Sequence, residues 1–341
     1  MTQRARGSPS ASLGRGWLRP SGLLVATLVA AVAACAPGGN TGEGMRRLSI
    51  ATGGTGGVFY PYGGGIARVL SEDLPNVEVT AEVTAASVDN LKFVKQGTSD
   101  LGFTMADMAA DAVAGRDAFA DFGPVPARAL AVLYPSYTHL VTLAGSGIDD
   151  VADLRGKVVS TGSPGAGTTV LAERILMVSG LNPATDIRTH NLGVAQSVDA
   201  LKDGKVDAFF WNGGLPTGAI LDLVNTQGVR ARILPLDATI PALNAKFGDG
   251  LYFRASIPKA TYGLEHDVPV VAVANLLVVS ETMPEALAYD ITRILFARQE
   301  TLAGIHPQAR ELAVERALAG ATIPFHPGAI RYYRERGVWK E

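Results

Sequence analysis

The chain has 341 residues, a formal net charge of −2 and 18% charged residues, with a mean hydropathy of +0.19. It carries no basic stripe or cluster, which argues against a nucleic-acid partner. A single cysteine, Cys35, excludes a disulfide bond within the chain.

The first 34 residues have the pattern of a secretory signal. Several arginines precede an apolar run at residues 23–34, which is too short for a conventional membrane-spanning helix. Small residues directly before Cys35 are similar to a bacterial lipobox, although ordinary cleavage beside an incidental cysteine is the alternative. We therefore expect residues 1–34 to be a lipoprotein signal peptide and Cys35 to be lipidated. Residues 35–45, rich in glycine and small polar residues, should form a flexible tether.

The rest of the chain is organised around a glycine-rich turn at residues 53–57. A short apolar run precedes this turn, and apolar periodicity after it predicts a helix. A strand, glycine turn and helix in this order bring bare backbone N–H groups to a helix N-terminus, which can bind a small anion such as a phosphate or carboxylate. The alternative is a tight turn that binds no ligand.

Residues 157–180 repeat this pattern, with glycines at positions 162, 165 and 167. A later motif also repeats, because Ser87-Val88-Asp89 is echoed by Ser197-Val198-Asp199. A repeat of whole strand–turn–helix units predicts two similar α/β lobes that face each other across a cleft. The second turn lacks the lysine of a Walker loop, which argues against nucleoside triphosphate binding.

Further candidate contacts follow predicted strands. Ser87 is predicted as the N-cap of a helix that ends near Gln96. The short strand at residues 100–104 leads to Asp107, which could contact a ligand at the carboxyl end of the strand or could cap the next helix. The corresponding strand at residues 206–210 leads to Trp211 and Asn212. Trp211 could form a wall of the ligand site or could belong to the core.

The longer apolar segments complete the predicted lobes. Residues 129–134 and 138–144 predict two buried strands, residues 268–280 a strand that returns to the first lobe, and residues 284–300 an amphipathic helix. We expect a final helix in the tail. The predicted boundaries are residues 46–145 plus 269–341 for lobe one and residues 146–268 for lobe two.

The motif Ala51-Thr52-Gly53-Gly54-Thr55-Gly56-Gly57-Val58-Phe59-Tyr60-Pro61 resembles the signature of the TAXI solute receptors, the extracytoplasmic subunits of one class of TRAP transporters. Further similar motifs follow in order over nearly the whole mature chain; they are Gly102-Phe103 before Asp107, Leu154-Arg155-Gly156-Lys157, Ser163-Pro164-Gly165-Ala166-Gly167-Thr168, Leu215-Pro216-Thr217 and His326-Pro327-Gly328-Ala329. The chain departs from the family pattern at Met105, where the family commonly has glutamine, and at Ala85 and Ala86, where it often has glycines.

The resemblance implies an α/β, two-lobed periplasmic-binding-protein fold of type II with the ligand cleft between the lobes. It implies a receptor that captures a small carboxylate, such as glutamate or a dicarboxylate, and delivers it to TRAP-type membrane permease subunits. Such a receptor lies outside the cytoplasm, in the periplasm or on the outer cell surface, and Cys35 would anchor it to the membrane. A ligand sensor that presents its closed form to a signalling kinase is the alternative.

We expect the two glycine turns and the neighbouring strand ends to contact the ligand. The candidates are Thr52, Thr55, Gly56, Gly57, Tyr60, Ser87 and Asp107 in lobe one, and Ser163, Gly167, Thr168, Thr169, Trp211 and Asn212 in lobe two. An enzyme on the same fold is less expected, because no cysteine follows Cys35, the five histidines are isolated and no Gly-x-Ser-x-Gly motif occurs. No cofactor or metal is expected.

Overall fold

The computed structural model describes residues 45–340. The predicted signal peptide, the predicted lipidation site and nearly all of the predicted tether lie outside the described residues.

A single 10-stranded sheet runs through the described chain in the order β2-β1-β3-β10-β4-β7-β5-β6, with β8 added to β4 and β9 to β10. The strands are β1 (Arg46–Ala51), β2 (Val77–Glu82), β3 (Leu101–Met105), β4 (Ala127–Leu143), β5 (Val158–Ser160), β6 (Arg188–His190), β7 (Ala208–Gly213), β8 (Ala231–Leu234), β9 (Phe253–Ile257) and β10 (Val268–Ser280).

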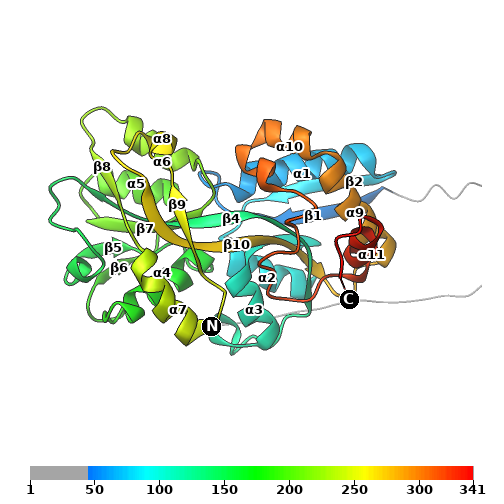
Figure 1. The fold of residues 1–341 in the computed structure, drawn as a ribbon, viewed down its shortest axis with the longest axis horizontal. Coiled ribbons are helices and arrows are strands. Elements are labelled where there is room, and N and C mark those ends of the chain that lie inside the picture. Colours follow the sequence, from blue (N-terminus) through cyan, green and yellow to red (C-terminus); the bar gives the residue numbers. More distant parts are fainter. Residues whose placement is uncertain (1–44, 341) are drawn as a thin grey trace, which may run out of the picture. The chain divides into compact units, whose positions relative to one another are not determined.

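The sheet has two halves, each with its own parallel strands. In the first half β1 pairs in parallel with β2 and β3, and in the second half β5 pairs in parallel with β6 and β7. The long strands β4 and β10 run antiparallel to their neighbours and pass through both halves (Figure 1). This topology confirms the predicted fold class, α/β with two lobes.

The prediction of two separate strands at residues 129–134 and 138–144 was wrong, because β4 is continuous. Pro135, Ser136 and Tyr137 keep their pairing with β10, opposite Ala274, Val273 and Ala272. From Tyr137 onward the strand also pairs with β7. β4 therefore gains β7 as a partner on its other side within one continuous strand, with no loop between its two parts.

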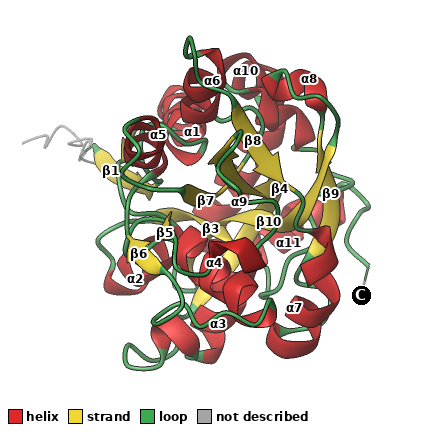
Figure 2. Ribbon diagram, turned by 90° about the vertical axis from the view of Figure 1, so that its left-hand side faces the viewer, coloured by secondary structure: helices red, strands yellow, loops and turns green. Residues whose placement is uncertain are grey.

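Helices cover both faces of each half. They are α1 (Phe59–Asp73), α2 (Ser87–Gln96), α3 (Ala106–Ala114), α4 (Gly167–Val178), α5 (Val194–Lys202), α6 (Gly218–Asn225), α7 (Ile240–Phe247), α8 (Lys259–Tyr262), α9 (Glu285–Ala297), α10 (Gln299–Ile305) and α11 (Pro327–Glu335). In the first half α1, α9, α10 and α11 cover one face and α2 and α3 the other; in the second half α5, α6 and α8 lie opposite α4 and α7 (Figures 1 and 2). The predicted helix at residues 284–300 corresponds to α9, which ends at Ala297, and the predicted final helix is α11.

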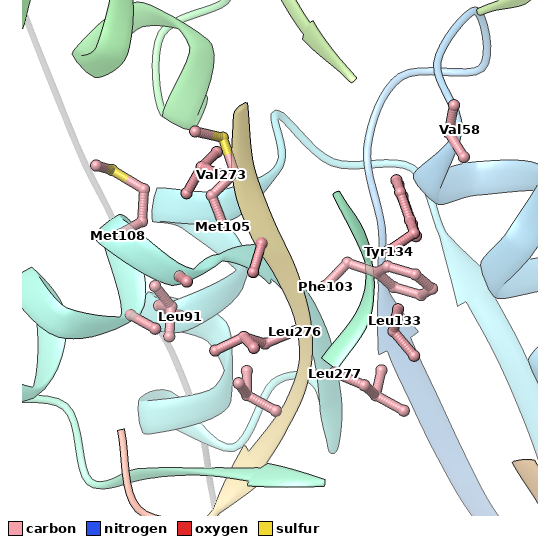
Figure 3. Close-up of a cluster of buried hydrophobic side chains, with 14 of the residues drawn as sticks. Val58, Leu91, Phe103, Met105, Met108, Leu133, Tyr134, Val273, Leu276 and Leu277 are labelled. Carbon is pink, nitrogen blue, oxygen red and sulfur yellow. The ribbon is translucent and has the colours of Figure 1, made fainter. Parts of the chain in front are cut away.

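The central strands are buried on both faces, which explains their nearly continuous apolar sequences. Phe103 on β3, Leu133 on β4 and Leu276 on β10 belong to one buried cluster, which packs between the helix layers (Figure 3). A second cluster includes Phe209 on β7 and Val198 on α5. Among residues 45–340, no helix is both long enough and apolar enough to cross a membrane.

Candidate functional site

A cavity of about 260 Å³ lies between the two halves of the fold. Its walls are the turns that precede α1, α2, α4 and α5, together with Met105 at the end of β3, Tyr134 on β4 and Trp211–Gly213 at the end of β7. The two glycine turns predicted from the sequence precede α1 and α4. Both turns therefore reach the same cavity, as the internal repeat predicted.

The helices that begin at this cavity have no side-chain caps. Their N-cap residues are Val58, Ala86, Ala166 and Gly193, and none has a side chain that could accept a hydrogen bond. The first N–H groups of a helix have no partner within the helix, and the helix dipole places partial positive charge there. The cavity wall is therefore rich in backbone donors.

One of these helix termini is already occupied by the opposite half of the fold. The N–H groups of Val88 and Asp89, in the first turn of α2, each donate to the carbonyl oxygen of Gly165 at 3.1 Å. Gly165 has φ +83°, and a Cβ atom there would lie 2.5 Å from the Asp89 carboxylate. This contact joins the two halves beside the cavity and leaves the termini of α1, α4 and α5 for a ligand.

A buried asparagine holds the turn before α2 in place. The Asn90 amide nitrogen donates to the carbonyl oxygens of Thr52 and Phe103 at 2.7 and 2.8 Å, and its oxygen accepts from the Thr84 hydroxyl at 2.6 Å. The Thr84 hydroxyl oxygen also accepts from the N–H of Ala86 at 3.1 Å. These bonds fix Ala86 at φ 99° and ψ −143°, a conformation that L-residues rarely adopt. Backbone strain is therefore stored in the cavity wall.

Trp211 forms part of the opposite wall. Its indole N–H donates to the Thr217 hydroxyl at 2.9 Å, which fixes the orientation of the ring. The ring lies against Gly57 and Gly213, where a Cβ atom would approach ring carbons to within 2.9 and 2.6 Å. The glycine in the first turn thus makes room for a side chain from the other half of the fold, and Trp211 lies between the two halves.

Two buried polar side chains in the wall have atoms without a protein partner. Asn212 is 6% exposed; its nitrogen donates to the Thr138 hydroxyl at 2.6 Å, whereas no group in residues 45–340 bonds its oxygen. Tyr134 is 1% exposed, and its hydroxyl likewise has no partner in the described chain. Burial raises the pKa of Tyr134 well above its ordinary value, so the hydroxyl stays neutral and can donate. Its ring stacks on Tyr62 at 5.9 Å, and Figure 3 shows Met105 and Tyr134 on either side of β10.

About half of the predicted contact residues line the cavity. These are Gly57, Ser87, Ser163, Gly167, Thr168, Trp211 and Asn212. The cavity wall does not include Thr52, Thr55, Gly56, Tyr60, Asp107 or Thr169. A direct ligand contact stays a prediction for every residue of both groups.

Several residues outside the wall make other contacts. The Thr52 hydroxyl donates to the carbonyl oxygen of Glu82 at 2.5 Å, and the Thr169 hydroxyl donates to that of Ser163 at 2.7 Å. The carbonyl oxygen of Gly56 accepts from the N–H of Ala219 at 3.3 Å, which is a second contact between the halves. These residues therefore support the turns from behind.

The prediction that Ser87 caps α2 was wrong. The N-cap is Ala86, and Ser87 is the first helical residue. The Ser87 hydroxyl instead accepts from the N–H of Met105 at 3.2 Å and so ties the start of α2 to the end of β3.

Asp107 belongs to a buried network of charges beneath the cavity. Its carboxylate accepts from the Tyr252 hydroxyl at 2.8 Å and lies 3.6 Å from the guanidinium of Arg174 on α4. Arg174 is 2% exposed and also pairs with Asp111 and Asp117. Burial raises the pKa of Asp107, and the charge of Arg174 opposes this shift. The network links α3 in the first half to α4 in the second.

Sequence reasoning missed several residues of the wall. Tyr134 comes from the interior of a long strand, where no local pattern distinguishes it. The turn at the start of α5, Leu192 to Gln196, could have been found because it is the second-half counterpart of the turn before α2. The chain departs from the TAXI pattern at Met105, Ala85 and Ala86. All three of these residues lie in the cavity wall.

The cavity wall contains no charged side chain. Within residues 45–340, no group of histidine, cysteine, aspartate and glutamate side chains is placed to hold a metal ion. The wall offers backbone N–H groups, hydroxyls, the side-chain amides of Gln196 and Asn212, and aromatic and aliphatic surface. These groups suit a small anion or a neutral polar molecule that also has apolar surface.

Comparisons with solved structures find proteins similar to this chain over most of its length. The periplasmic aliphatic sulphonate binding protein SsuA from Escherichia coli is 18% identical, with 85% of this chain and 83% of that chain covered, at a TM-score of 0.46. The alkanesulfonate-binding protein SsuA from Xanthomonas axonopodis pv. citri is 19% identical, with 87% of this chain and 96% of that chain covered, at a TM-score of 0.47. A binding protein component of an ABC phosphonate transporter from Pseudomonas aeruginosa is 11% identical, with 77% of this chain and 79% of that chain covered, at a TM-score of 0.49.

A family model also matches most of the described chain. Residues 50–337 match the NMT1-like family, and this span includes both glycine turns, every strand that lines the cavity and the final helix. The chain therefore belongs to the NMT1-like family.

Proposed function

We propose that the chain is an extracytoplasmic solute-binding receptor that captures a small carboxylate and delivers it to a membrane permease. The observation that carries this proposal is the cavity between the two halves of the fold, where the N-termini of α1, α4 and α5 meet without side-chain caps. Backbone N–H groups at helix N-termini bind anions through charge-assisted hydrogen bonds, which are about twice as strong as neutral ones.

The proposed boundaries of the lobes are residues 46–145 plus 269–341 for lobe one and residues 146–268 for lobe two. In this scheme a ligand is held by both lobes, and β4 and β10 are the connections about which the lobes open and close. The hydrogen bonds from Val88 and Asp89 to Gly165 support this scheme, because they join groups on opposite sides of the cavity.

The transporter is proposed to be of the TRAP type, with this chain as its TAXI receptor. The motifs from Ala51 to Pro61 and from Ser163 to Thr168 support this assignment. We propose in addition that Cys35 carries lipid and holds the receptor at the membrane. Intact mass measurement of membrane-extracted protein should reveal two or more acyl chains, since one chain gives only marginal anchoring. A Cys35→Ser protein that stays on membranes would contradict the anchor.

The proposal predicts binding without chemical turnover. The test is a thermal-shift screen of small mono- and dicarboxylates, followed by recovery of each hit for mass spectrometry. A ligand at a hundredfold excess over its Kd should stabilise the protein by about 2.7 kcal/mol. Recovery of the unchanged compound supports a receptor, whereas conversion at a catalytic rate would replace the receptor by an enzyme. The absence of any stabilising carboxylate would refute the ligand class.

A further inference from the structure

We propose that residues 211–219 form a docking segment of the second half that seats on the first half and holds the cavity closed. The segment runs from the end of β7 to the first turn of α6, and its residues Trp211, Asn212 and Gly213 line the cavity. The division of the chain into two lobes rests on the proposed function, but the test of this segment needs no ligand. Failure of that test would therefore leave the receptor function standing.

The Trp211 ring is held rigidly within the second half. The Thr217 hydroxyl accepts from the indole N–H at 2.9 Å and donates to the carbonyl oxygen of Gly214 at 2.8 Å. The N–H of Thr217 donates in turn to the Tyr262 hydroxyl at 2.8 Å, and Thr217 is fully buried. All of these partners belong to the second half, so the ring should keep its orientation when the two halves separate.

The first glycine turn provides the surface on which this ring is seated. Neither Gly56 nor Gly57 has a positive φ, so their backbone conformations do not require glycine. Close approach requires it instead: a Cβ atom on Gly57 would lie 2.9 Å from the Trp211 ring, and one on Gly56 would lie 3.3 to 3.4 Å from side chains at the starts of α5 and α6. The carbonyl oxygen of Gly56 also accepts from the N–H of Ala219. The turn therefore has the shape that admits the docking segment.

A glutamine of the first half binds the middle of the docking segment. Gln308 lies in a short helix at Pro307–Glu311, is 8% exposed, and donates from its amide nitrogen to the carbonyl oxygen of Leu215 at 2.8 Å. A Cβ atom on Gly214 would lie 2.7 Å from the Gln308 side chain and 2.8 Å from the Tyr134 ring. The glycine turn, β4 and this short helix are far apart in the chain, and all three contact the same docking segment.

These contacts join protein groups only, so the segment should be seated in the ligand-free protein. Closely packed surfaces fit in few relative positions, which favours a docked or a separated arrangement over intermediate ones. The docking segment also supplies part of the cavity wall. Docking should therefore complete the cavity, and separation should open it.

Hydrogen exchange of single backbone N–H groups, followed by NMR on the ligand-free protein, measures docking directly. The N–H of Ala219 is bonded to Gly56 across the two halves, so it should exchange only when the segment separates. The N–H of Thr217 is bonded to Tyr262 within the second half and is the internal control. Protection of Ala219 in the wild type is the first expected result, and an unprotected Ala219 overturns the proposal.

A substitution that does not touch Ala219 or its partner tests whether the segment docks as a unit. Gln308→Met removes the bond to Leu215 and should accelerate exchange at Ala219 about two- to tenfold, the cost of one hydrogen bond. Gln96→Met makes the same replacement at an exposed position at the end of α2 and should leave the rate unchanged. Equal rates at Ala219 in these two variants overturn the proposal.

A pair of variants in the glycine turn tests the seat of the ring. Gly57→Ala adds a methyl group against Trp211 and should accelerate exchange at Ala219 roughly five- to 150-fold, the usual cost of overpacking. Gly54→Ala, in the same turn with open space around the added carbon, should leave the rate unchanged. If exchange at Thr217 rises as much as at Ala219 in Gly57→Ala or Gln308→Met, the segment unfolds locally instead of separating, which also overturns the proposal. Should Gly57→Ala fail to fold, Gln308→Met decides the test.

Discussion

The strained backbone at Ala86 predicts that removing one methyl group will stabilise the protein. Ala86 has φ 99° and ψ −143°, and a residue held in such a conformation costs about 1–3 kcal/mol. Glycine adopts this conformation freely, but its greater freedom in the unfolded chain costs about 0.5–1 kcal/mol. Loss of the half-buried methyl group costs about 0.4 kcal/mol, half the value for a fully buried carbon. The net expectation for Ala86→Gly is a gain of about 1 kcal/mol.

The neighbouring Ala85 provides the matched control. It is also half-buried in the cavity wall, but it is not among the residues with positive φ. Ala85→Gly therefore has the costs without the relief of strain and should destabilise the protein by about 1 kcal/mol. The two variants should differ by about 2 kcal/mol in opposite directions from wild type.

Urea unfolding of the ligand-free proteins, followed by circular dichroism, measures this difference. It should appear as a shift of the unfolding midpoint, while the dependence of the unfolding free energy on urea concentration stays the same. If Ala86→Gly is as destabilising as Ala85→Gly, the backbone at Ala86 is not strained. A change of slope for either variant would show that the extent of unfolding has changed, and the comparison would then need a structure of that variant.

Three further predictions concern buried charges and contact between the halves of the fold. Arg174→Met leaves the buried carboxylate of Asp107 without a counter-charge and should cost about 3–5 kcal/mol in urea unfolding. Arg47→Met, at an exposed ion pair with Glu78, should cost at most about 1 kcal/mol, and equal losses would refute the network. Burial lowers the pKa of His139 from 6.5 to about 4, so the free energy of unfolding should fall by about 3 kcal/mol as the pH drops from 6.5 to 4. His139→Gln should make the free energy of unfolding depend less on pH in this range. Gly165→Ala should weaken the binding of any acid found by the screen, because the added Cβ atom would clash with the Asp89 carboxylate. Gly180 has a similar φ of +78° with open space around it, so Gly180→Ala is the control and should bind like wild type. Equal affinities of the two variants would show that closure of the lobes does not need the contact between Gly165 and α2.

The parts of the fold set by local sequence could be predicted. The glycine turns at Gly53–Gly57 and Gly162–Gly167 lie within a few residues of the strands and helices they join, so their pattern shows in one short segment. The repeat then predicted two α/β lobes before any contact was known. The continuity of β4 could not be predicted, because Pro135 is a residue that usually interrupts a central strand.

The rest of the site depends on residues far apart in the chain. Tyr134 lies on β4, which β10 separates from β3, so its place in the cavity wall depends on pairing with a strand more than 130 residues later in the chain. Arg174 likewise meets Asp111 across 63 positions of sequence. Asp107 was considered as a ligand contact or a helix cap, and its partners Tyr252 and Arg174 lie too far along the chain to be inferred from spacing. The strained φ of Ala86 is likewise fixed by Thr84 and Asn90 and leaves no mark in composition.

The most direct test of the account is the affinity for the best-binding acid of three proteins: wild type, Thr168→Val and Thr226→Val. Thr168 lies in the cavity wall at the start of α4, and valine removes its hydroxyl at nearly constant volume. Thr226 lies at the end of α6, outside the wall, where its hydroxyl donates to the carbonyl oxygen of Asp222. Thr168→Val should bind from a few-fold to about a hundredfold more weakly, the cost of one hydrogen bond to a neutral or charged partner, and Thr226→Val should bind like wild type. Unchanged affinity in both variants would contradict the account and place the ligand outside this cavity.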